Sequence, residues 1–116
     1  FRGPPRLTNW ICRTEDLDGA LSTAPKGSGT ATDLQRGDYR WRFAIPASGR
    51  LPFDDCHPAL IQWQGDRHPA RDLPDRGVRL TGLQITHPDA EAYDPAAERA
   101  AVASVRELAM RAVTMR

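Results

Sequence analysis

The chain has 116 residues, of which 40% are hydrophobic and 27% charged, and its formal net charge is +1. This length is typical of one domain with its own hydrophobic core, and the composition excludes collagen, coiled coils and disulfide-rich miniproteins. Because basic and acidic residues balance in both halves of the sequence, we expect no nucleic acid and no membrane as a partner.

The sequence shows no apolar run long enough for a membrane span and no charged segment followed by an apolar stretch, as a signal peptide would have. We expect its two cysteines, Cys12 and Cys56, to be free thiols in a reducing cytoplasm. Lys26 is the single lysine among 16 basic residues, a bias that we interpret as bacterial. The chain opens on Phe1 without a methionine, which indicates a trimmed start or a fragment.

The first part of the chain predicts a strand, a helix and a second strand. Residues 7–13 form a β-rich apolar run, and Thr14 is the expected N-cap of a short helix that ends before Pro25. Residues 30–35 have β propensity but little apolar weight. We therefore predict a short strand there.

Residues 39–45 (YRWRFAI) carry the clearest strand pattern, because aromatic or aliphatic side chains alternate with basic ones. Such a strand has one apolar face and one face with two guanidinium groups. Residues 59–63 (ALIQW) are apolar on both faces, which predicts a strand inside a sheet. Residues 65–77 are an expected connection, residues 80–86 an expected further strand, and a C-terminal amphipathic helix is expected from Asp94 onward.

Short chemical motifs are scarce. His57, His68 and His87 each precede a proline and lie far apart, which is unlike the close spacing of zinc ligands. The sequence contains no phosphate-binding glycine loop, no nucleophile-elbow motif and no pair of histidines at metalloprotease spacing. Arg40 and Arg42 share one face of their expected strand, and the planar guanidinium suits carboxylate ligands.

The order strand, helix and three strands resembles the glyoxalase-like domain of the vicinal oxygen chelate superfamily over about residues 5–90. Several strings carry the resemblance: YRWR at 39–42, PALIQWQG at 58–65, HPA at 68–70, LPD at 73–75, LTGL at 80–83 and HPD at 87–89. The resemblance implies an α+β fold in which a βαβββ module forms a cupped mixed sheet with flanking helices. On this basis residues 1–116 form a single glyoxalase-like domain or domain fragment: the module at 5–65, a connection at 66–79, and an extra strand plus a C-terminal helix at 80–116.

In that superfamily, His or Glu side chains on the first and last strands of each module hold a divalent metal. The equivalent positions here fall on Asn9 and Gln62. Neutral amides are poor ligands for zinc, iron or manganese, so these residues do not support a divalent metal cofactor. We name no metal ligand and no catalytic residue, and whether the chain is an enzyme stays open.

Members of the superfamily pair two such modules, and this chain resembles a second module without the first. We therefore expect a homodimer or a separate chain that supplies the missing module. The leading prediction is a small oxygen-rich or anionic ligand bound in the concave face of the sheet, with Asn9, Gln62, Arg40, Arg42 and His68 as ligand-binding residues. The alternatives are a metal-free binding or sequestering module of the bleomycin-resistance type, and a structural remnant whose cup is filled by side chains such as Phe53.

Overall fold

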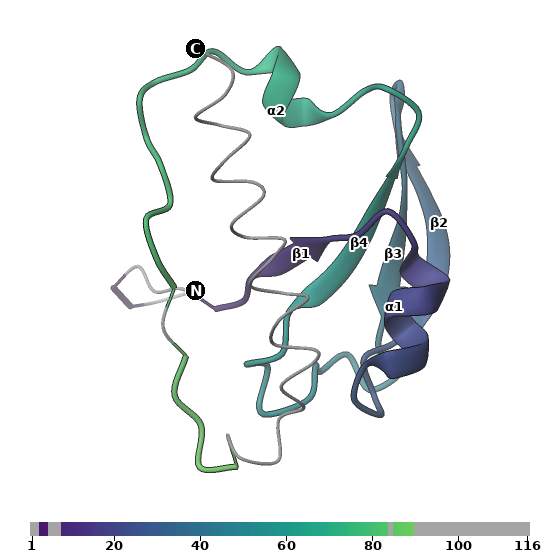
Figure 1. The fold of residues 1–116 in the computed structure, drawn as a ribbon, viewed down its shortest axis with the longest axis vertical. Coiled ribbons are helices and arrows are strands. Elements are labelled where there is room, and N and C mark those ends of the chain that lie inside the picture. Colours follow the sequence, from purple (N-terminus) through teal and green to yellow (C-terminus); the bar gives the residue numbers. More distant parts are fainter. Residues whose placement is uncertain (1–2, 5–7, 84, 90–116) are drawn as a thin grey trace.

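The computed structural model describes residues 3–4, 8–83 and 85–89 of the chain (Figure 1). These described residues contain a mixed four-stranded sheet and two helices, which confirms the predicted α+β class. The elements in chain order are β1 (Ile11–Arg13), α1 (Leu17–Thr23), β2 (Thr30–Arg36), β3 (Tyr39–Ile45), β4 (Ala59–Gln64) and α2 (Pro69–Asp72).

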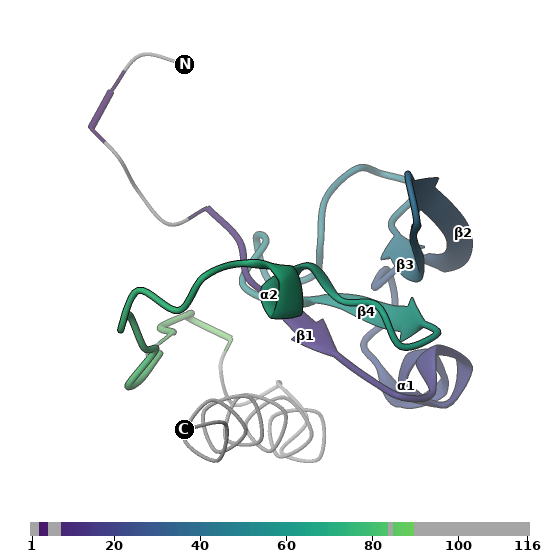
Figure 2. The ribbon, with the colours of Figure 1, turned by 90° about the horizontal axis from the view of Figure 1, so that it is seen from above.

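The strands are arranged in the order β1-β4-β3-β2 (Figure 1). Strand β3 is antiparallel to both of its neighbours, β2 and β4, whereas β1 runs parallel to β4. The predicted interior position of β4 is confirmed, since this strand lies between β1 and β3. Viewed from above, α1 covers one side of the sheet, and α2 follows β4 at one end of it (Figure 2).

Helix α1 begins two residues later than the sequence suggests. The N-cap is Asp16 rather than Thr14, because the Asp16 carboxylate accepts a hydrogen bond from the Gly19 N–H at 3.0 Å. The Thr14 hydroxyl instead accepts from the Asp16 N–H at 3.1 Å and thereby shapes the turn before the helix. The cap directs Leu17 into the sheet, where its side chain is fully buried.

The outer parts of the fold differ from the prediction. Among residues 8–13 only Ile11–Arg13 form a strand, and the predicted connection at 65–77 contains the short helix α2. Residues 80–83 and 85–86 do not form the predicted strand. A β-rich segment becomes a strand only where a neighbouring strand pairs with its backbone, and Leu80 in this segment is 59% exposed. The helix expected from Asp94 lies outside the described residues.

No disulfide joins Cys12 to Cys56, in agreement with the prediction. Cys12 on β1 is buried, and burial raises the pKa of its thiol to about 11, so the thiol is protonated at neutral pH. No helix within the described part of the chain is both long and apolar enough to cross a lipid bilayer.

Gly29, which precedes β2, provides a test of the local packing. Its φ is +116°, and an added Cβ would lie 2.6 Å from the carbonyl carbon of Ile45. We expect Gly29→Ala to lower the free energy of unfolding by about 2 kcal/mol or more, measured by urea denaturation, because backbone strain and a steric clash act together. Gly49→Ala is the matched control: φ is +71° with no atom within 4 Å, and the loss should be about 1 kcal/mol. Equal losses in both variants would contradict the close approach of Gly29 to β3.

Candidate functional site

The register of the strands divides the sheet into two faces. Cross-strand partners share a face, so the pairs Asp33↔Arg42 and Arg42↔Gln62 lie on one side, and the pair Trp41↔Trp63 lies on the other. Both Arg42 and Gln62 contact α1, which identifies their side as the face that the helix covers. We call the opposite side the aromatic face; its central side chains are those of Tyr39, Trp41, Phe43 and Trp63.

Gln62 lies on the helix-covered face, and its amide is fully used in holding α1. Its Oε1 accepts a hydrogen bond from the Leu17 N–H at 3.1 Å, and its Nε2 donates to the Glu15 carbonyl at 2.9 Å. The Gln62 side chain therefore pairs with one backbone N–H in the first turn of α1 and with one backbone carbonyl in the turn before the helix. This geometry is that of a structural link between β4 and α1.

Arg42 lies next to Gln62 and is also engaged with neighbouring side chains. Its guanidinium binds both carboxylate oxygens of Asp18 on α1, at 2.7 and 3.1 Å, and its Nε lies 3.3 Å from the carboxylate of Asp33 on β2. The hydrogen bond from Arg42 holds the pKa of the Asp18 carboxyl below its usual value. Arg40 shares this face by alternation and is exposed.

His68 belongs to the other face, where it is the N-cap of α2. Its Nδ1 accepts a hydrogen bond from the Ala70 N–H at 3.1 Å, and its ring packs edge-on to Trp63 with 4.8 Å between the ring centroids. Desolvation lowers the pKa of His68, and the positive charges of Arg13 and Arg71 lower this pKa further. The imidazole is therefore neutral at neutral pH, and its ring proton lies on Nε2 because Nδ1 accepts.

The five residues singled out from the sequence do not form one site. The structure brings Gln62 and Arg42 together under α1, with Arg40 farther along the same face, whereas His68 lies on the aromatic face. Asn9 is exposed and lies just before β1. Phe53, the side chain expected to fill the cup of a structural remnant, lies in the loop between β3 and β4, where its ring packs edge-on to His87 at 5.6 Å.

The aromatic cluster is the feature that sequence reasoning did not identify as a site. Trp41 and Trp63 pack with 5.4 Å between centroids and an interplanar angle of 45°, and Tyr39 meets Trp63 edge-on at 6.5 Å. Each of these side chains is only partly buried. The alternation over Tyr39–Ile45 contained the necessary pattern, but we assigned that apolar face to the core.

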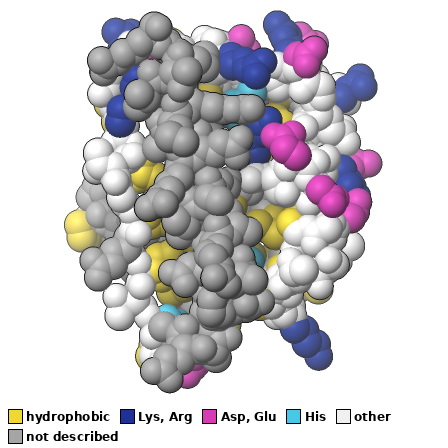
Figure 3. Space-filling view, viewed as in Figure 1, with side chains coloured by type: hydrophobic (Ala, Val, Ile, Leu, Met, Phe, Trp, Pro, Cys, Tyr) yellow, Lys and Arg dark blue, Asp and Glu magenta, His cyan; other side chains and the backbone are white. Residues whose placement is uncertain are grey.

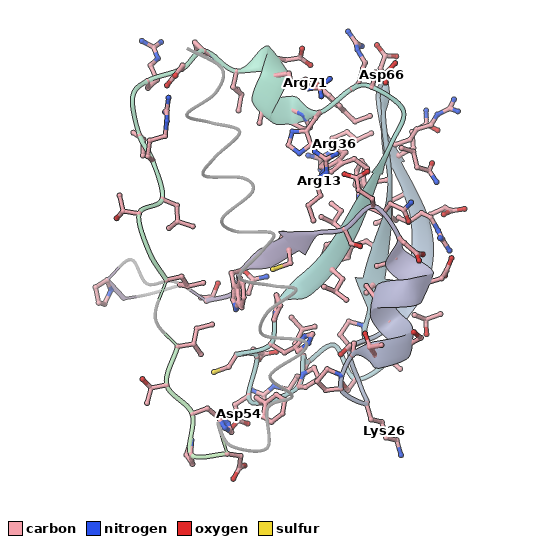
Figure 4. All side chains as sticks on the ribbon, viewed as in Figure 1. Arg13, Lys26, Arg36, Asp54, Asp66 and Arg71 are labelled. Carbon is pink, nitrogen blue, oxygen red and sulfur yellow. The ribbon has the colours of Figure 1, made fainter. Side chains whose placement is uncertain are left out.

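Arginine side chains flank the α2 end of the aromatic face. Arg13 shares this face with its register partner Ile61, and Arg71 lies on α2 (Figure 4). In the space-filling view, blue guanidinium groups and a cyan imidazole lie together at this end (Figure 3). Tyr39 donates a hydrogen bond to Asp72, which ties α2 to β3 beside the cluster.

The side chains that β1 and β4 present on the aromatic face do not fit a divalent metal. By alternation, Ile11 and Arg13 face this side from β1, and Ile61 and Trp63 face it from β4. Hydrocarbon, guanidinium and indole groups do not ligate divalent cations, and the amide of Gln62 is used on the opposite face. Within residues 3–4, 8–83 and 85–89, no three His, Cys, Asp or Glu side chains are grouped as metal ligands would be.

Comparison with known proteins gives one result. A family model described as a glyoxalase-like domain matches residues 1–101 of the chain. No curated protein and no solved structure matches it.

The structural role of Gln62 leads to a prediction about stability. We expect Gln62→Ala to lower the free energy of unfolding by about 1–3 kcal/mol, because the Leu17 N–H and the Glu15 carbonyl both lose their partner. Gln64→Ala, at an exposed position on the same face of β4, should change it by less than about 0.5 kcal/mol. Urea denaturation measures both values, and a Gln62→Ala protein as stable as the Gln64→Ala control would contradict the link between β4 and α1.

Proposed function

The chain belongs to the glyoxalase-like domain family, and from that premise we propose that it binds a small oxygen-rich or anionic molecule on the aromatic face of its sheet, without a metal. The family resemblance implies that small molecules bind in the cupped face of the sheet, and we assign that role to the aromatic face because it lies opposite α1. A metal-free binding or sequestering module is thus preferred to a metal-dependent enzyme. We assign no catalytic residue.

The observation that carries this proposal is the partly buried cluster of Tyr39, Trp41 and Trp63 on the side of the sheet away from α1. Ligand sites in proteins combine apolar and aromatic walls with a few polar groups that fix orientation. His68 at the rim of the cluster, together with the arginines near it, supplies such groups. These polar groups favour an anionic or oxygen-rich ligand over a purely apolar one.

The preference for metal-free binding rests on which side chains face the ligand. A chelating mechanism needs anionic or imidazole ligands on the first and last strands, and the side chains of β1 and β4 on this face are apolar, indole or cationic. Affinity must then come from contact with aromatic surface and from hydrogen bonds.

We also propose that a second copy of the chain, or a chain that supplies the missing module, closes the sheet. Ile11 on β1 and Ile45 on β3 share the aromatic face and are 48% and 42% exposed. The edge strands β1 and β2 each have a pairing partner on one side only within the described sheet. Association would cover both the apolar side chains and the unpaired backbone groups. Light scattering that finds only monomers across a wide concentration range would contradict this proposal.

Binding is tested by titrating the full chain with a panel of small carboxylates, phosphates and sugars. The readouts are the thermal midpoint and the fluorescence of a Trp10→Phe variant, in which Trp41 and Trp63 are the remaining tryptophans. We expect at least one panel member to raise the midpoint and change the fluorescence saturably, equally before and after treatment with a chelator. Trp63→Leu should weaken that binding about tenfold, the effect of roughly one lost aromatic contact.

Trp10→Phe is also the matched control for binding, because the Trp10 indole donates its hydrogen bond to the Cys56 carbonyl at 2.8 Å, away from the cluster. The affinity of this variant should equal that of the unmodified chain. The proposal fails if no panel member binds saturably, or if the binding persists unchanged in Trp63→Leu. Binding that disappears on chelation and returns with a divalent metal would favour the metal-dependent alternative.

A further inference from the structure

We propose that the ligand is a planar aromatic carboxylate, with its ring against Trp41 and Trp63 and its carboxylate at the α2 end of the aromatic face, beside Arg71. This inference rests on the binding function proposed above and narrows the class of ligand. Three features of the described residues carry it: the shape of the aromatic cluster, the guanidinium of Arg71 at its α2 end and the N–H donor of His68.

The first feature is the shape of the cluster. Trp41 and Trp63 are direct partners across two antiparallel strands, and their indoles are tilted by 45° with 5.4 Å between centroids. Tyr39 and His68 meet Trp63 at interplanar angles of 80° and 66°, so they border the indole with edge contacts. Aromatic side chains gain most from a partner that is itself a flat π-system in an offset or edge-to-face geometry. A planar ring therefore matches this surface better than a sugar or an aliphatic chain.

The second feature is the guanidinium of Arg71 at the α2 end, which is not paired with a carboxylate of any residue that the structure describes. Arg13 has a carboxylate partner, since its Nη2 lies 2.6 Å from Glu15 Oε1. The Arg71 guanidinium donates instead to the Asp66 backbone carbonyl at 2.9 Å, which satisfies a hydrogen bond without cancelling the charge. Arg71 forms no ion pair with any residue that the structure describes. Asp72, the neighbour of Arg71 on α2, keeps its negative charge but is held by the Tyr39 hydroxyl and forms no ion pair with Arg71.

The third feature is the donor that His68 presents. Its Nδ1 accepts from the Ala70 N–H, so the neutral ring keeps its proton on Nε2. A carboxylate has two oxygens in one plane, which suits one guanidinium together with one N–H donor. Arg71 and His68 both belong to the short segment around α2 that borders the aromatic cluster. A carboxylate bound by these two residues could be attached directly to a ring that lies on Trp63.

Isothermal titration calorimetry of the full chain with three related probes tests the ligand class without any mutation. The probes are 2-naphthoate, 2-naphthamide, which keeps the ring but lacks the charge, and cyclohexanecarboxylate, which keeps the charge but lacks the aromatic ring. We expect 2-naphthoate to bind about tenfold more tightly than either of the others, since each lacks one interaction worth roughly a factor of ten.

The position of the carboxylate is tested with Arg71→Gln. This variant should weaken the binding of 2-naphthoate about tenfold, to the level of 2-naphthamide, and leave 2-naphthamide unchanged. Arg76→Gln is the matched control, because Arg76 is likewise exposed but lies beyond α2. It should bind all three probes as the unmodified chain does. Equal thermal midpoints would confirm that both variants are folded.

The outcomes separate this inference from the proposed function. If either cyclohexanecarboxylate or 2-naphthamide binds as tightly as 2-naphthoate, the ligand is not an aromatic carboxylate. The proposal that a small molecule binds on the aromatic face would still stand. The same holds if none of the three probes binds but a member of the earlier panel does. If neither the probes nor the panel bind, both proposals fail. Equal loss of 2-naphthoate binding in Arg71→Gln and Arg76→Gln would overturn the assigned position of the carboxylate.

Discussion

The amide of Gln62 determines which face of the sheet helix α1 covers. Its two hydrogen bonds connect β4 to the backbone on both sides of the α1 N-cap, so the helix is fixed to one face of the sheet. Backbone groups at the start of a helix have no partner within the helix, and a buried one that stays unpaired is costly. Leu17, whose N–H is one of these groups, is also the buried apolar side chain of α1. Hydrogen bonding and apolar burial therefore select the same docking of the helix.

This docking gives the arginines of the sheet and of α2 different roles. Arg42 is covered by α1, where the carboxylates of Asp18 and Asp33 balance its charge, so it strengthens the attachment of the helix. Arg71 lies on α2, where its guanidinium donates a hydrogen bond to the neutral backbone carbonyl of Asp66. A guanidinium already paired with carboxylates attracts a further anion only weakly, because its charge is balanced. A guanidinium bonded to a neutral carbonyl keeps its full positive charge and can still pair with an anion. The residue type alone does not distinguish these two situations.

The sequence predicts much of the sheet because its information is local. Alternation over Tyr39–Ile45 defines β3 to the residue, and the apolar run from Ala59 predicts the interior strand β4. The assignment of the faces is nonlocal, since it depends on contacts such as that between Gln62 and Leu17, which are 45 residues apart. The helix α2 was missed because it has four residues, although a capping side chain at His68 followed by proline at the first helical position is a known start signal. Residues 80–86 have the residue pattern of a strand, but a strand also needs a neighbouring strand to pair with, and the pattern does not predict one.

Side-chain alternation also explains why a ligand position that the family resemblance implies, Gln62, does not lie on the aromatic face. Successive residues of a strand point to opposite faces, so an assignment of the ligand position that is wrong by one residue moves it to the other side of the sheet. Gln62 lies between Ile61 and Trp63, and only those two share the aromatic face. A fold can be kept while the side chain at one position changes from a metal-binding group to an indole. On the aromatic face of this chain the residue next to Gln62 is Trp63, whose indole packs against Trp41 with 5.4 Å between ring centroids. The binding that we propose would therefore depend on aromatic contact rather than on metal ligation.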